Sequence, residues 1–240
     1  MPAFFVHGVP DTHRVWGEVR SHLERRDVLA PDLPGFGGQP GPAEPTKEFY
    51  AGWLTEQLEA VGEPVDLVGH DWGSLLAVRV ATTRPDLIRT LAFGGGPIDE
   101  TYVWHDMAQL WQTPEVGEQV MEATTEDAIT DGLVAAGLTL AQAIAAAVHL
   151  DDEMKRCILG LYRSAIAVGA EWGPDLDRGF DRPCTAIWGG ADPYAPADFG
   201  VRMAERLGGT TEIFEGGHHW WELDRPDDVA SILTELWARA

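Results

Sequence analysis

Asp71 has the surroundings of a catalytic nucleophile. It stands in Gly69-His70-Asp71-Trp72-Gly73, between a short β-branched apolar run and an Ala/Leu/Val-rich helical pattern. This layout is typical of a nucleophile elbow, a sharp strand-to-helix turn that lifts one side chain above a sheet. The glycines fit such a turn, because a Cβ at either position would collide where strand and helix cross. A carboxylate is already ionised at neutral pH, so this nucleophile would need no base to activate it.

Two further side chains follow later predicted strands. Asp192 comes after the apolar run 184–188, and His219 comes after the run 211–214. Open α/β sheets place their sites at the carboxyl ends of strands, so we expect both residues to meet Asp71. Asp71 would attack an sp³ carbon to form an ester, and His219 would take a proton from the water that hydrolyses it. Asp192 would hold the imidazole in one tautomer.

Each of these assignments has an alternative. Asp192 could only cap the helix that follows Pro193, and His218 competes with His219 as the base. His218, His219 and Glu222 are a weak metal-cluster candidate, because one short loop supplies all three potential ligands. We therefore expect neither a metal nor another cofactor.

Strand and helix patterns alternate around these residues. Apolar runs predict strands near residues 3–6, 27–30, 65–68, 89–93, 184–188 and 211–214, with helices near 13–26, 46–61, 74–84, 196–207 and from 226. Such alternation implies βαβ units. We expect an α/β fold with a mostly or wholly parallel sheet of about six strands and helices on both faces. The 27–30 strand is expected at an edge, where a homodimer could cover it.

The pattern changes between the fourth and fifth strands. From Ile98 to about Arg178 only helical segments are evident, with caps predicted at Thr139 and Asp151. We therefore expect a core of residues 1–96 and 181–240, interrupted by a helical lid of residues 97–180.

The composition limits the classes of partner. The chain has 17 basic and 39 acidic residues, a net charge of −22, which argues against nucleic acid and anionic membrane. Two cysteines cannot form a disulfide framework, and neither a signal sequence nor a membrane-length apolar run is evident. We expect a cytoplasmic protein whose partners are a small apolar organic substrate and water.

The sequence resembles the α/β-hydrolase family, in the branch of epoxide hydrolases and haloalkane dehalogenases, which use Asp within Gly-His-Asp-x-Gly. The resemblance covers almost the whole chain through motifs at residues 7–10, 32–37, 69–73, 188–193 and 219–226. It implies the order Asp71, Asp192, His219 for nucleophile, acid and base, with oxyanion donors at the backbone N–H groups of Val9 and Trp72. Members of this branch usually have two additional strands before the strand that is expected here at residues 3–6.

The resemblance does not decide whether the leaving group is an epoxide oxygen or a halide. Epoxide hydrolases use two lid tyrosines, and Tyr162 in Leu161-Tyr162-Arg163-Ser164 resembles the second of them. Met107 occupies the position of the first lid tyrosine, so His105 or Tyr102 is a candidate substitute donor.

Haloalkane dehalogenases hold halide with indole or amide N–H groups. Trp72 matches one such position, Trp104 or Trp111 could supply a second indole, and Val9 stands where relatives have Asn. We expect an epoxide hydrolase forming a diol, with Trp104, His105, Met107 and Trp111 in the substrate pocket. The alternatives are a haloalkane or haloacid dehalogenase and a non-catalytic small-molecule binding protein.

Overall fold

A single six-stranded sheet organises the molecule. The computed structural model describes residues 1–240, and all neighbouring strands are parallel, in the order β2-β1-β3-β4-β5-β6. The strands are β1 (Ala3–Val6), β2 (Val28–Leu29), β3 (Val65–His70), β4 (Ile88–Gly94), β5 (Cys184–Gly189) and β6 (Thr210–Phe214). This confirms the predicted parallel sheet, with the short strand β2 at one edge.

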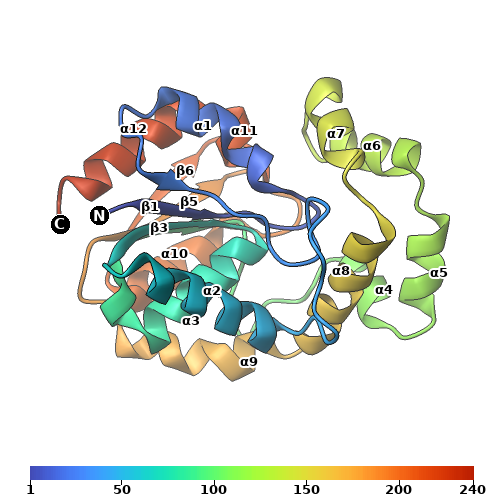
Figure 1. Cartoon of the computed structure of the whole chain (residues 1–240), viewed down its shortest axis with the longest axis horizontal. Coiled ribbons are helices and arrows are strands. Elements are labelled where there is room, and N and C mark those ends of the chain that lie inside the picture. The colour runs from blue at the N-terminus through green and yellow to red at the C-terminus, as the bar shows by residue number, and fades with distance from the viewer.

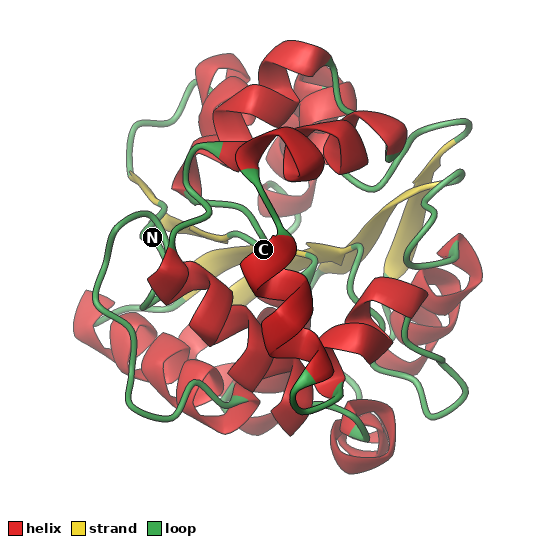
Figure 2. Ribbon diagram, turned by 90° about the vertical axis from the view of Figure 1, so that its right-hand side faces the viewer, coloured by secondary structure: helices red, strands yellow, loops and turns green.

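Helices cover both faces of the sheet. One face is covered by α1, α11 and α12, and the other by α2, α3 and α10 (Figures 1 and 2). The core helices are α1 (Gly17–His22), α2 (Lys47–Val61), α3 (Trp72–Thr83), α10 (Ala197–Leu207), α11 (Trp221–Asp224) and α12 (Pro226–Trp237). Short 3₁₀ helices are η1 (His13–Trp16), η2 (Pro85–Leu87) and η3 (Gly173–Arg178). Every residue of the central strand β3 is buried, including Asp66, whose carboxylate is paired with Arg25 and Arg89.

Local capping signals place several helix ends. The Thr46 side chain accepts a hydrogen bond from the Phe49 N–H at 3.2 Å, and Gly62 ends α2 in the left-handed conformation. The predicted 13–26 helix is shorter, because η1 precedes α1 and the chain becomes extended at Leu23. Leu23 is buried there, so tertiary packing overrides the helical periodicity.

A run of helices separates β4 from β5. It comprises α4 (Asp106–Gln112), α5 (Val116–Ala123), α6 (Glu126–Ala135), α7 (Leu140–Ala147), α8 (Asp152–Ser164) and α9 (Val168–Trp172). Helices α4 to α8 lie together beyond one end of the sheet, whereas α9 returns beneath it (Figure 1). The predicted caps at Thr139 and Asp151 are both present, the first as a capping box with Gln142. We call this helical run the lid.

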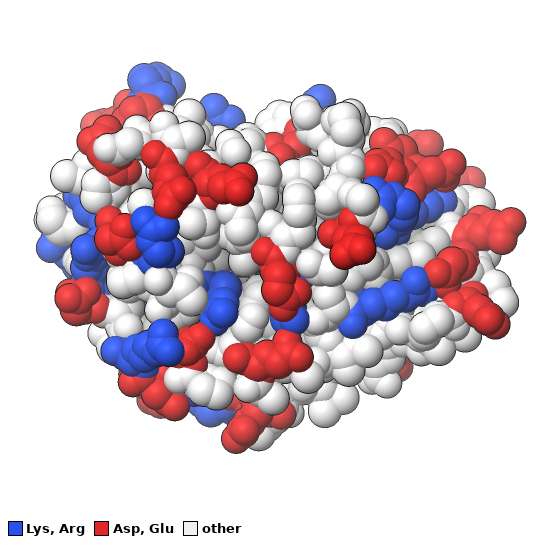
Figure 3. Space-filling view, turned by 60° about the horizontal axis from the view of Figure 1, so that its bottom comes forward, with Lys and Arg blue, Asp and Glu red and all other residues white.

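Charged side chains of both signs are interspersed on the face shown in Figure 3. Many arginines are paired with acidic residues, as in Arg163 with Glu118 at 2.6 Å and Arg206 with Asp177 at 2.8 Å. None of the helices has the length and apolar character needed to cross a membrane.

Candidate active site

Asp71 occupies the sharp turn between β3 and α3. Its backbone has φ 50° and ψ −119°, a conformation that non-glycine residues rarely adopt. A Cβ at Gly73 would collide with the carbonyl oxygen of Val6, and one at Gly69 would collide with the backbone of Gly73. The two glycines therefore allow β3, β1 and α3 to approach closely enough to hold Asp71 in this conformation.

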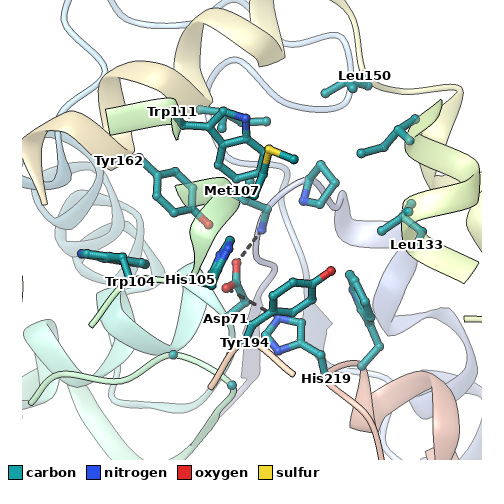
Figure 4. A pocket seen from close by; sticks show the side chains of 18 of the residues that line it. Asp71, Trp104, His105, Met107, Trp111, Leu133, Leu150, Tyr162, Tyr194 and His219 are labelled. Atoms are coloured by element: carbon teal, nitrogen blue, oxygen red, sulfur yellow. Dashed lines mark hydrogen bonds and ion pairs between the residues drawn. The ribbon is translucent and has the colours of Figure 1, made fainter. Parts of the chain in front are cut away.

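The structure brings His219 and Asp192 to Asp71. The Nδ1 atom of His219 lies 2.7 Å from Oδ2 of Asp192. Its Nε2 atom lies 3.6 Å from Oδ2 of Asp71 (Figure 4). The other oxygen of Asp192 accepts the backbone N–H groups of Tyr194 and Ala195 at 2.8 and 3.0 Å. Asp192 thus orders its own turn and also receives the imidazole.

Charge coupling within this group is strong. Burial opposes charge on His219, but Asp192 and Asp71 outweigh it and raise the His219 pKa well above its ordinary value. Burial likewise opposes charge on Asp71, yet His219 and the Val9 N–H together lower the Asp71 pKa. At neutral pH the arrangement is an imidazolium between two carboxylates.

The expected oxyanion donors flank Asp71. The backbone N–H of Val9 donates to Oδ1 of Asp71 at 2.7 Å. Trp72 is the first residue of α3, so its N–H has no acceptor within the helix. Because Oδ1 is held by Val9, Oδ2 is the oxygen available for attack.

Tyr162 and His105 point toward Asp71 from the lid (Figure 4). Tyr162 is 2 % exposed, and burial raises its pKa well above the ordinary value, so its hydroxyl stays protonated as a donor. His105 caps α4, where its Nδ1 accepts the Ala108 N–H at 3.3 Å. Burial lowers the His105 pKa, so the ring is neutral and carries its proton on Nε2.

Other candidate lid donors are already engaged. The Tyr102 hydroxyl donates to the carbonyl oxygen of Tyr194 at 3.0 Å, and the Trp104 indole donates to that of Ala165 at 3.1 Å. The buried Trp111 indole N–H makes no hydrogen bond. Of these three residues, only Trp111 therefore keeps a free polar hydrogen.

A cavity of about 260 Å³ joins these groups. It is lined by 24 residues, including the predicted Trp104, His105, Met107 and Trp111, and also Tyr162 and His219. Several lining residues were not predicted from the sequence: Tyr194, Met121, Ile129, Leu133, Leu150 and Ile158. Tyr194 was detectable from its place two residues after Asp192, whereas the lid residues carry no signal beyond helical periodicity.

A second buried pair lies behind His219. His70 Nε2 is 3.0 Å from the carbonyl oxygen of His219, and His70 Nδ1 is 3.0 Å from Oε1 of Glu222. Burial lowers the His70 pKa to about 3 and raises the Glu222 pKa well above its ordinary value. A neutral His70 therefore donates to the His219 backbone. No group of three or more His, Cys, Asp or Glu side chains is arranged to hold a metal ion.

Comparison with known proteins identifies a family match over most of the chain. The model of the Alpha/beta hydrolase family matches residues 3–232. Lipase LipV of Mycobacterium tuberculosis is 36 % identical over 87 residues, which are 36 % of this chain and 33 % of LipV. Epoxide hydrolase 2 of Siraitia grosvenorii is 36 % identical over 93 residues, 36 % of this chain and 29 % of that protein. The alignments thus span about a third of each of these relatives.

Solved structures show the same fold. The haloalkane dehalogenase DbeA from Bradyrhizobium elkani has a TM-score of 0.80 at 22 % identity, covering 100 % of this chain and 92 % of DbeA. At this identity the likeness establishes the fold alone.

Proposed function

The chain belongs to the Alpha/beta hydrolase family, and we propose that it is an epoxide hydrolase that forms a diol through an ester on Asp71. The observation that carries the proposal is the placing of Asp71, with Val9 N–H on Oδ1 and His219 Nε2 beyond Oδ2. An ionised carboxylate in this position is equipped to attack an sp³ carbon directly. The relatedness to epoxide hydrolase 2 supports the same reaction class.

In the first step Oδ2 of Asp71 forms a bond to a ring carbon, and the bond from that carbon to the ring oxygen breaks. Tyr162 and His105 face the same space (Figure 4), so their O–H and N–H groups stabilise the developing alkoxide. The alkoxide takes a proton from the Tyr162 hydroxyl. The proton that His219 then loses restores Tyr162, which leaves a neutral imidazole and a hydroxyalkyl ester.

In the second step His219 removes a proton from water, and the hydroxide attacks the Asp71 carbonyl carbon. The negative charge develops on Oδ1, which already accepts the Val9 N–H, and the Trp72 N–H is the second donor. Collapse breaks the ester bond, and the alkoxide takes the proton of the new carboxyl group. The products are a diol, the Asp71 carboxylate and a protonated His219.

Ester formation itself converts His219 into a base. In the free enzyme two carboxylates hold its pKa high, and alkylation makes one of them neutral. Asp192 remains and keeps the ring in place at 2.7 Å. A histidine that is charged before alkylation is thereby free to accept a proton afterwards.

Haloalkane hydrolysis is the second candidate. Its support is the free indole N–H of Trp111, which lines the cavity and could bind a halide. The Trp72 indole N–H is also unpaired, but Trp72 is not among the cavity-lining residues. A haloacid fits poorly, because no Lys or Arg lines the cavity to pair with its carboxylate.

A single turnover in water labelled with heavy oxygen tests the proposal. With enzyme in excess over a terminal epoxide, the label is expected in the Asp71 carboxylate, because the attacking water delivers its oxygen there. The mass of the peptide containing Asp71 measures it. Label found in the diol at the first turnover would instead mean direct attack by water. An absence of diol from every epoxide would refute the activity.

A further inference from the structure

The cavity is strongly asymmetric about Asp71. The side chains that the proposed reaction uses, those of Asp71, His219, Tyr162 and His105, lie near one another in it (Figure 4). Leu133 and Leu150 stand on the opposite side of the cavity from Tyr162 (Figure 4). The lid also lines the cavity with five apolar side chains: Met121, Ile129, Leu133, Leu150 and Ile158. We call these five residues the arm.

The arm has no group that could recognise charge. Among all 24 lining residues the ionised groups are Asp71 and His219, and both are used in the chemistry. A carboxylate or ammonium group placed in the arm would lose its hydration without gaining a partner. A neutral apolar chain, in contrast, gains from every methylene that it buries.

The cavity lining reaches the solvent at residues of α4 and α6. Met107 of α4 lines the cavity and is also 43 % exposed. Ala128 and Gly132 of α6 line the cavity and are exposed as well. They are four residues apart, on one face of the helix, so two small residues border the opening. A Cβ at Gly132 would meet no atom within 4 Å, which shows that the space in front of it is empty.

We propose that the substrate is a neutral terminal epoxide with one apolar tail, which lies in the arm and extends toward the opening at Gly132. This inference rests on the proposed function for the reactive end and on the arm for the tail. A cavity of about 260 Å³ suits a slender chain, since small-molecule sites range over about 300–1,000 Å³. The residue at position 132 then sets the tail length that the site accepts.

Gly132→Phe tests the role of the arm in turnover. The aromatic side chain would fill the open space, so kcat/KM for decene oxide is expected to fall at least about tenfold more than kcat/KM for propene oxide. Gly52→Phe is the matched control, because Gly52 also lies in a helix, faces open space and is absent from the cavity lining. An equal loss for both epoxides, or no loss for either, would overturn the proposal.

Binding of the diol products tests the role of the arm independently of the proposed reaction. Quenching of tryptophan fluorescence reports binding, since Trp104, Trp111 and Trp220 line the cavity. Decane carrying two hydroxyls at one end is expected to bind at least about tenfold more tightly than the propane diol, and Gly132→Phe should abolish the difference. Decanoate should not bind. If the diols behave so without any epoxide turnover, the arm is established and the proposed function fails; equal binding of the two diols refutes the arm.

Discussion

Two carboxylates, first Asp192 and then Asp71, raise the pKa of His219. In the free enzyme Nε2 of His219 lies 3.6 Å from Asp71 Oδ2, and ester formation would remove the charge of that carboxylate. Asp71→Asn imitates this change, because the amide is neutral and still offers an oxygen to the Val9 N–H. We predict that the variant has a markedly lower His219 pKa.

The size of the effect follows from this separation. Two unit charges about 4 Å apart interact by about 4 kcal/mol at an effective dielectric constant of about 20. One pKa unit corresponds to about 1.4 kcal/mol, so the His219 pKa should fall by about 3 units in Asp71→Asn. The sign is downward, since the lost carboxylate stabilised the protonated ring. Asp192 stays in place, so the orientation of the ring is preserved.

Titration by nuclear magnetic resonance measures this shift. The imidazole C–H signal of His219 is assigned by its disappearance in a His219→Gln variant. Glu205→Gln is the control, because Glu205 is exposed on α10 and forms no ion pair. An unchanged His219 pKa in Asp71→Asn would refute the view that alkylation switches this histidine from ion-pair partner to base.

Three further variants test the elbow, the buried carboxyl and the lid. Gly73→Ala should lower the free energy of unfolding, measured in urea, by about 1–3 kcal/mol or prevent folding, because its Cβ meets the β1 backbone. Gly52→Ala should instead stabilise α2 by about 0.5–1 kcal/mol. Burial raises the pKa of Glu222 above 4.5, so the stability of the folded protein falls as pH rises beyond that value. Glu222→Gln cannot titrate, so the wild-type protein should lose stability in urea relative to this variant as the pH rises above about 5. Tyr162→Phe should lower kcat for epoxide opening about 10²-fold with little loss of thermal stability, and an unchanged kcat would exclude Tyr162 as the acid.

Much of the fold was predictable because its signals are local. Thr46 and Asp151 cap their helices through hydrogen bonds to residues three positions on, so the sequence nearby contains all the information. Strands β3 and β5 are buried throughout. The alternation of strand and helix patterns along the sequence predicted that the sheet is parallel. The gathering of Asp71, Asp192 and His219 was predictable in turn, because parallel strands end at one edge.

The roles of the lid side chains could not be predicted, because their hydrogen bonds join residues that are distant in the sequence. Whether Trp104 or Tyr102 has a free donor depends on the carbonyl groups of Ala165 and Tyr194, 61 and 92 residues away. The donor position of His105 depends on its capping of α4, which fixes the tautomer. Such facts require the tertiary structure, so the sequence could name candidate lid residues but could not rank them.

The covalent ester on Asp71 is the central claim, and mass spectrometry of His219→Gln tests it most directly. Without the base, Asp71 should still open an epoxide but the ester should persist. We predict that decene oxide adds its full mass to the intact variant, and that fragmentation locates the addition at Asp71. Asp71→Asn, treated in the same way, should gain no mass. An unmodified His219→Gln protein after exposure to decene oxide, or an addition at another residue, would contradict the account.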